Sequence, residues 1–109
     1  MNTLSAIFVA AQMVGSVNCM TPEANIAFVE HNHPGATHVT LRGDQMDRAR
    51  AMIKAPILND STLAQAWSHP SKENIWVILF HQRGGAMCRR GWVTISPDLY
   101  AGVMEGQES

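Results

Sequence analysis

The sequence has 109 residues, which fits one domain. Two cores of half this size would each be too small to be stable without disulfides or bound metal ions. An apolar fraction of 46% excludes a disordered chain, and a net charge of −1 excludes a protein that its overall field steers to nucleic acid or an anionic membrane. Charged residues make up only 16%, so the domain either buries more surface than usual or shows apolar surface to a partner.

The charges are unevenly distributed along the chain. Residues 1–41 carry only Glu23 and Glu30, whereas the stretch between Glu73 and Asp98 carries arginines and no acid. We therefore expect a bland N-terminal half and one local basic stretch.

The first apolar segment, residues 4–14, suits a buried helix or a buried strand equally well. No Lys or Arg precedes the run Ala6–Ala11, and a secretory signal needs a positive region there, so we expect core and a cytoplasmic protein. Two cysteines, Cys19 and Cys88, are fewer than small secreted scaffolds carry, which predicts reduced thiols.

The segment Thr21-Pro22-Glu23 predicts a helix start, because threonine caps, proline fits the first helical position and glutamate meets the positive end of the dipole. Residues 22–31 would place Ala24, Ala27, Phe28 and His31 on one face, and Pro34-Gly35 would end the element. A strand over 26–31 is the alternative.

Alternation over residues 37–42 predicts a half-buried strand with Val39 and Leu41 on one side. Asp44 is the expected N-cap of a helix over 45–54, whose apolar stripe is Met46, Ala49 and Ile53. A shorter helix is expected to follow, capped by Asp60-Ser61, with Leu63, Ala66 and Trp67 facing inward and His69-Pro70 closing it.

The continuous apolar run at 75–80 is the strongest strand signal and predicts burial on both faces. Gly84-Gly85 would turn the chain, residues 92–95 would return as a partner strand, and Ser96-Pro97-Asp98 would cap a last helix bearing Leu99, Tyr100 and Val103. The predicted fold is one α+β domain over residues 1–109, a three- or four-stranded, mostly antiparallel sheet packed with helices, with a frayed tail from about residue 106.

Three side chains fit a zinc site: His31, His33 and Asp44 would leave a fourth position open for water, as a hydrolytic site needs. The spacing His-x-His-Pro-x(10)-Asp resembles the JAMM family of zinc isopeptidases. That resemblance implies that the two histidines and the aspartate are zinc ligands, although Leu41 stands where that family has a serine. The alternative is a solvated turn whose histidines meet a helix C-terminus.

A basic, glycine-rich segment at 81–92 is expected to form a loop between two strands. Its partner-binding residues would be Arg83, Arg89, Arg90 and Trp92, because arginine pairs with phosphate or carboxylate and tryptophan can stack on a base. The alternative is a solvated hairpin loop with Trp92 in the core.

These observations favour a small binding or inhibitory module without chemistry of its own, of a type common in phages and mobile elements. It would dock onto a protein or ribonucleoprotein partner. The alternatives are a degenerate JAMM-like zinc hydrolase that uses His31, His33 and Asp44, and a nucleic-acid-binding accessory protein that uses the 81–92 loop. Homo-oligomerisation stays open, and zinc is the only cofactor that the residues suggest.

Overall fold

A computed structural model describes residues 19–105, which form a four-stranded antiparallel sheet and three α-helices. The strands lie in the order β1-β2-β3-β4, each paired with its neighbour in sequence. The predicted α+β class is confirmed. The elements in chain order are α1 (Pro22–Asn32), β1 (Thr37–Leu41), α2 (Asp44–Ile53), the 3₁₀ helix η2 (Pro56–Asp60), β2 (Leu63–Ser68), β3 (Ile75–Arg83), β4 (Ala86–Ile95) and α3 (Pro97–Glu105).

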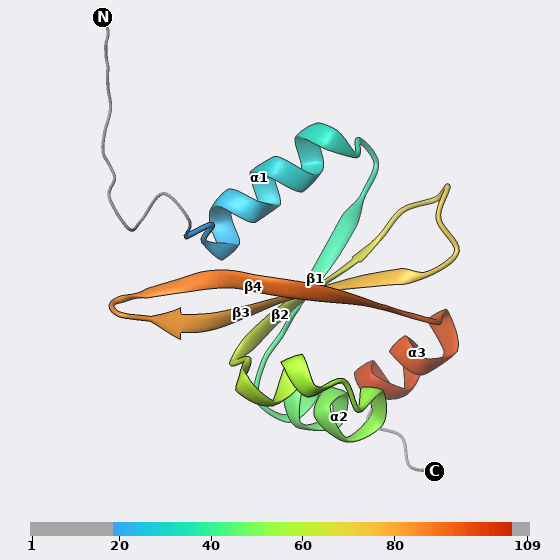
Figure 1. Ribbon diagram of the computed structural model, residues 1–109. Coiled ribbons are helices and arrows are strands. Elements are labelled where there is room, and N and C mark those ends of the chain that lie inside the picture. Colours follow the sequence, from blue (N-terminus) through green and yellow to red (C-terminus); the bar gives the residue numbers. More distant parts are fainter. Residues whose placement is uncertain (1–18, 106–109) are drawn as a thin grey trace, which may run out of the picture.

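The helices are divided between the two faces of the sheet (Figure 1). One face carries α1 alone, and the other carries α2, η2 and α3. Each face has its own apolar cluster. The α1 cluster comprises Val29, Leu63, Trp67, Ile78 and Phe80. The larger cluster opposite comprises Leu41, Met46, Ala49, Leu58, Ala64, Ala66, Ile75, Val77, Leu79, Ile95 and Val103.

Strand β3 is the spine of the fold, as the apolar run at 75–80 predicted. Its side chains alternate between the clusters, with Ile78 and Phe80 facing α1 and Val77 and Leu79 facing the other helices. A strand covered on both faces has no solvent side, which is why its sequence lacks the usual alternation with polar residues.

Helix α1 begins as predicted: the Thr21 hydroxyl accepts a hydrogen bond from the backbone N–H of Ala24 at 3.2 Å, and proline follows the cap. The predicted inward face is wrong, however. Asn25 and Val29 are buried and Phe28 is exposed. Apolar residues of α1 lie on all sides of the helix, so their spacing does not indicate which side is buried. The polar contacts of Asn25 with the sheet determine that side.

The predicted helix after residue 60 is wrong, because residues 63–68 form strand β2. Alanine and glutamine favour a helix when taken alone. Here strand pairing on both sides, with β1 and β3, overrides that preference. Trp67 does face inward, toward α1.

Strand β1 and helix α2 occur where expected, with two local differences. Val39 is exposed, and of the two apolar residues only Leu41 is buried. The helices on the face away from α1 cover only the end of this edge strand. The N-cap of α2 is Gly43, with no side-chain cap bond, and Asp44 is the first helical residue. Met46 and Ala49 are buried as predicted.

Residues 81–92 are not a loop. Strands β3 and β4 extend into a long hairpin whose turn is only Gly84-Gly85, and Gly84 has a φ of +59° that glycine adopts without strain. The pairing is interrupted once: Phe80 pairs with Arg89 and Leu79 with Gly91, so Arg90 is an extra residue in β4, a β-bulge.

Cys19 and Cys88 form a disulfide that joins the residues before α1 to β4. The prediction of reduced thiols is therefore wrong. The number of cysteines indicates whether a chain depends on disulfides to fold, but it does not show whether two given cysteines are neighbours in the folded structure. The predicted apolar segment 4–14 and the tail from residue 106 lie outside the described residues.

Candidate binding groove

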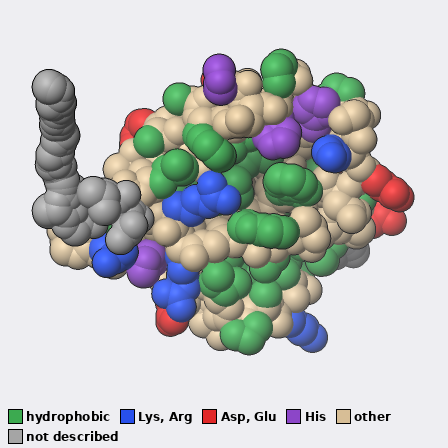
Figure 2. Space-filling view, turned by 45° about the horizontal axis from the view of Figure 1, so that its top comes forward, with side chains coloured by type: hydrophobic (Ala, Val, Ile, Leu, Met, Phe, Trp, Pro, Cys, Tyr) green, Lys and Arg blue, Asp and Glu red, His purple; other side chains and the backbone are tan. Residues whose placement is uncertain are grey.

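An open groove lies between α1 and the strands β3 and β4, with a volume of about 140 Å³. We call it the aromatic groove. Its lining consists of Phe28, Val29, His33, Trp67, Trp76, Ile78, Arg89 and Trp92. Figure 2 shows this face, on which hydrophobic side chains surround a basic group and the acidic side chains lie at the rim.

Two large side chains flank the groove and stay exposed. Trp92 is 55% exposed and Phe28 is 48% exposed. Trp92 stacks on Trp76, with ring centroids 5.9 Å apart and ring planes at 21°, and His33 meets Trp76 edge-on at 5.8 Å. These contacts hold the rings in fixed orientations, so a ligand would not have to order them.

The bulge brings Arg89 and Trp92 to the same face. Side chains alternate along a regular strand, so residues three apart point to opposite faces. The extra residue Arg90 shifts this alternation by one position. Arg89 therefore pairs with Phe80 and Trp92 with Ile78, both members of the α1 cluster.

A buried polar network connects Arg89 to the floor of the groove. Its guanidinium Nη1 donates to Asn25 Oδ1 at 3.0 Å, and Asn25 Nδ2 donates to Gln65 Oε1 at 2.7 Å. The same oxygen accepts from Trp67 Nε1 at 3.1 Å, while Gln65 Nε2 donates to the carbonyl of Pro22 at 2.9 Å. Asn25 and Gln65 are fully buried, so these bonds fix both α1 and the arginine.

The disulfide also restrains the backbone next to Arg89. Cys88 is bonded to Cys19, and the next residue, Arg89, donates its backbone N–H to the carbonyl of Met20 at 2.8 Å. The segment before α1 is thus attached to the β4 edge, and Arg89 is held through both backbone and side chain.

Arg89 has no acidic partner in the described part of the chain. The ion pairs between residues 19 and 105 join Arg50 to Asp47 and Arg90 to Asp60. Outside this range, residues 1–18 contain no Asp or Glu, and residues 106–109 contain Glu108. A half-buried guanidinium that lies among aromatic rings, with a neutral amide as its hydrogen-bond partner, retains a net positive charge to offer a ligand.

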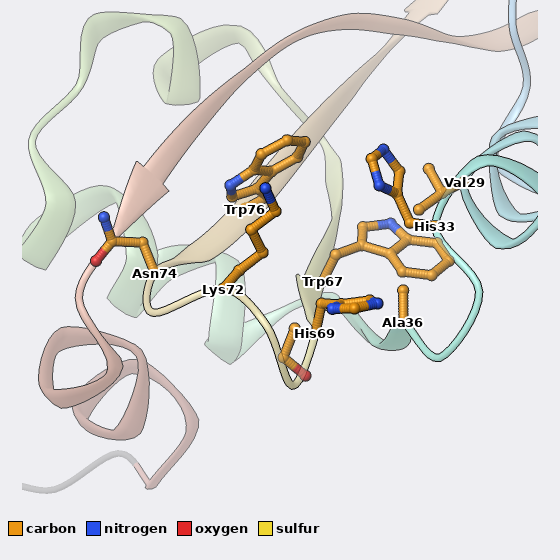
Figure 3. A pocket seen from close by; sticks show the side chains of 9 residues that line it. Val29, His33, Ala36, Trp67, His69, Lys72, Asn74 and Trp76 are labelled. Atoms are coloured by element: carbon orange, nitrogen blue, oxygen red, sulfur yellow. The ribbon is translucent and has the colours of Figure 1, made fainter.

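A second, smaller pocket continues the groove toward the β2–β3 loop (Figure 3). It shares Val29, His33, Trp67 and Trp76 with the aromatic groove and adds Ala36, Ser68, His69, Lys72 and Asn74. In the close-up, Lys72 extends toward the ring of Trp76. The Nε2 of His69 lies 2.8 Å from the carbonyl of Pro34, and its Nδ1 accepts from the backbone N–H of Ser71 at 3.0 Å. The two hollows adjoin through the four residues that they share.

The arginines predicted to act together diverge. Arg89 lines the aromatic groove, whereas Arg90 bonds to Asp60 of η2 at 3.2 Å, toward the other face of the sheet. Arg83 ends β3 beside the hairpin turn. Of the predicted binding residues, the structure brings only Arg89 and Trp92 together.

The predicted zinc ligands are also separated. His31 is exposed in the last turn of α1, and His33 follows that helix and contacts Trp76. Asp44 starts α2 beyond the far end of β1, which spans five residues, about 16 Å. Within residues 19–105, no three His, Cys, Asp or Glu side chains are placed to hold a metal ion.

Burial raises the pKa of Tyr100 by desolvation, but this phenol packs with the cluster on the face of the sheet opposite the aromatic groove.

Sequence reasoning missed Phe28, Trp67 and Trp76 as lining residues. The sequence predicts the tryptophans to be core residues, which is confirmed for Trp67, and it predicts Phe28 on the buried face of its helix, which is wrong. For Trp76, the signal is the alternation of β3, which puts this residue on the same face as Ile78 and Phe80.

No protein-family model, curated protein or solved structure matches this chain.

Proposed function

We propose that this chain is a binding module that docks onto a partner protein through the aromatic groove. The observation that supports it best is that two exposed aromatic side chains, Trp92 and Phe28, line one groove with a half-buried arginine. Tryptophan and arginine dominate the binding energy of protein interfaces, and a monomeric surface rarely leaves aromatic side chains grouped in this way.

The architecture supports binding over catalysis. Among the described residues, the lining of the groove contains no carboxylate or hydroxyl nucleophile, and its Arg89 and Trp67 side chains donate to the buried network that anchors α1. What the network supplies is rigidity. A preformed site loses less conformational entropy on association, which improves affinity.

A single-stranded nucleic acid is the second candidate, because exposed tryptophan stacks on bases. Such sites combine stacking with a row of cations along the backbone of the ligand. Here Arg90 bonds to Asp60 of η2 and Arg83 lies beside the hairpin turn, so Arg89 lines the aromatic groove and Lys72 lines the adjoining pocket. Two separate cations do not form such a row. The protein partner is therefore favoured.

The disulfide bears on where the module works. Disulfides persist in oxidising compartments and are rare in the cytoplasm. We propose an oxidising environment for the folded domain, in place of the cytoplasmic location expected from the sequence. No helix within residues 19–105 has the length and apolar character needed to cross a membrane.

The test is a selection of random displayed peptides on the full disulfide-bonded chain, followed by binding measurements on purified peptides. We expect saturable binders whose affinity falls at least about tenfold in Trp92→Ala, since central tryptophans contribute about 2 kcal/mol or more. Met52→Ala is the matched control, because Met52 is 40% exposed on helix α2, which lies on the opposite face of the sheet. Binders that tolerate Trp92→Ala, or their complete absence, would refute the proposal.

A further inference from the structure

We propose that the aromatic groove recognises an acidic peptide segment, one in which a carboxylate lies beside an apolar side chain, with Arg89 as the residue that reads the carboxylate. This inference rests on the proposed function and specifies the partner. It depends on the charge of the groove, which the apolar lining alone would not predict.

The first argument is the missing counter-charge. Transferring a guanidinium from water into an apolar lining costs free energy unless an opposite charge compensates it. Arg90, the next residue, has such a partner in Asp60 at 3.2 Å. The Arg89 guanidinium donates instead to two neutral acceptors, the side-chain oxygen of Asn25 at 3.0 Å and the sulfur of Met20 at 4.0 Å. A ligand carboxylate would supply the charge that this part of the protein lacks.

The second argument is orientation. The bulge at Arg90 and the bond from Arg89 to Asn25 direct the guanidinium into the groove rather than away from it. Bulges commonly occur where a strand has to redirect a side chain at a binding site. Guanidinium is also the side chain that best matches a carboxylate, because its planar donors can form two parallel hydrogen bonds.

The third argument is size and surroundings. A hollow of about 140 Å³ suits a short peptide segment, not a whole domain or a chain of nucleotides. Of the described residues that line it, Arg89 is the only one with a permanent charge. One anionic group beside one apolar anchor therefore fits the groove better than a polyanion does.

The experiment compares peptides selected on the wild-type chain with those selected on Arg89→Gln. We expect wild-type binders to be enriched in Asp or Glu next to an aromatic or branched apolar residue, and this acidic preference to disappear in Arg89→Gln while the apolar preference remains. For one selected peptide, replacing its Glu by Gln should weaken binding about tenfold to wild type and have little effect on Arg89→Gln.

Two further variants keep the test sharp. Arg83→Gln removes an exposed arginine from the same hairpin and should leave both preferences intact. Arg89→Lys keeps the charge, so it should retain the acidic preference with lower affinity. If Arg89→Gln fails to fold, as judged by its thermal transition, Arg89→Lys and the Glu-to-Gln peptide pair still decide the matter.

The outcomes separate the two proposals. Groove-dependent binders without an acidic preference would overturn the role of Arg89 and leave the binding module in place. An absence of groove-dependent binders would overturn both. Salt-sensitive binding of a fluorescein-labelled oligothymidylate that needs Trp92 and exceeds that of every selected peptide would replace the acidic peptide with a single-stranded nucleic acid.

Discussion

At the residue scale, Gln65 supports the site although it never touches the open groove. Its amide is fully buried and forms bonds with Asn25, Trp67 and the carbonyl of Pro22. A buried amide with satisfied partners adds modest stability, but removing it leaves the Asn25 amide and the Trp67 indole N–H without their acceptor in a buried place. The cost of losing this side chain therefore exceeds its own contribution.

We expect Gln65→Leu to lower the free energy of unfolding by about 3 kcal/mol, because several donors and acceptors lose their partners at once. Urea denaturation of the full chain measures the change. Gln82→Leu is the control, since Gln82 is exposed on β3 and its replacement should cost less than about 0.5 kcal/mol. Equal effects of the two substitutions would show that the network contributes no particular stability.

At the element scale, prediction succeeded where local pattern and tertiary packing agree. The apolar run of β3 needs burial in any arrangement, and the cap at Thr21 acts within its own turn. Prediction failed for β2, whose alanines and glutamine become a strand only through pairing with β1 and β3. Arg89 and Trp92 stay predicted binding residues, and the structure places them in strand β4 rather than on the expected loop, because a bulge depends on register and leaves no local signal.

The element that depends most on long-range restraint is α1. Its only fully buried apolar side chain is Val29, so its packing on the sheet is supplemented by the disulfide and the Asn25–Gln65 bond. Closing a loop across a sequence separation of 69 residues restricts the unfolded chain, and the entropic model assigns this about 4 kcal/mol.

Reduction should therefore lower the midpoint of urea unfolding by an amount that corresponds to about 4 kcal/mol, and the double variant Cys19→Ser, Cys88→Ser should behave like the reduced wild type. Alkylation followed by mass spectrometry counts the free thiols in each sample. Two alkylated cysteines in the untreated, folded protein would contradict the disulfide.

At the scale of the whole molecule, the two faces of the sheet differ in the number of apolar residues that they bury. Helices α2 and α3 with η2 cover the larger apolar cluster, and Arg50 strengthens that side by donating to the carbonyls of Leu58 and Ser61. The α1 side has fewer buried apolar residues and contains the groove. Binding sites commonly lie in the less stable part of a domain.

Native-state hydrogen exchange should reveal this difference. We expect the amides of α1 to exchange through local opening at lower free energy than those of β3, which should exchange only on global unfolding. Reduction of the disulfide should accelerate exchange in α1 more than in α2. Equal protection of α1 and β3 would show that the two sides unfold as one unit.

The single unpaired residue of β4 also determines how this protein can change over evolutionary time. Substitutions at Arg90 keep the parity of the strand, whereas deleting that residue would restore strict alternation and turn the cation or the indole to the far side of the sheet. Insertions or deletions of a single residue between positions 89 and 92 should therefore abolish the proposed recognition even where they leave the fold intact. Distant relatives with the same activity should keep the odd spacing of arginine and tryptophan more faithfully than the amino acids between them.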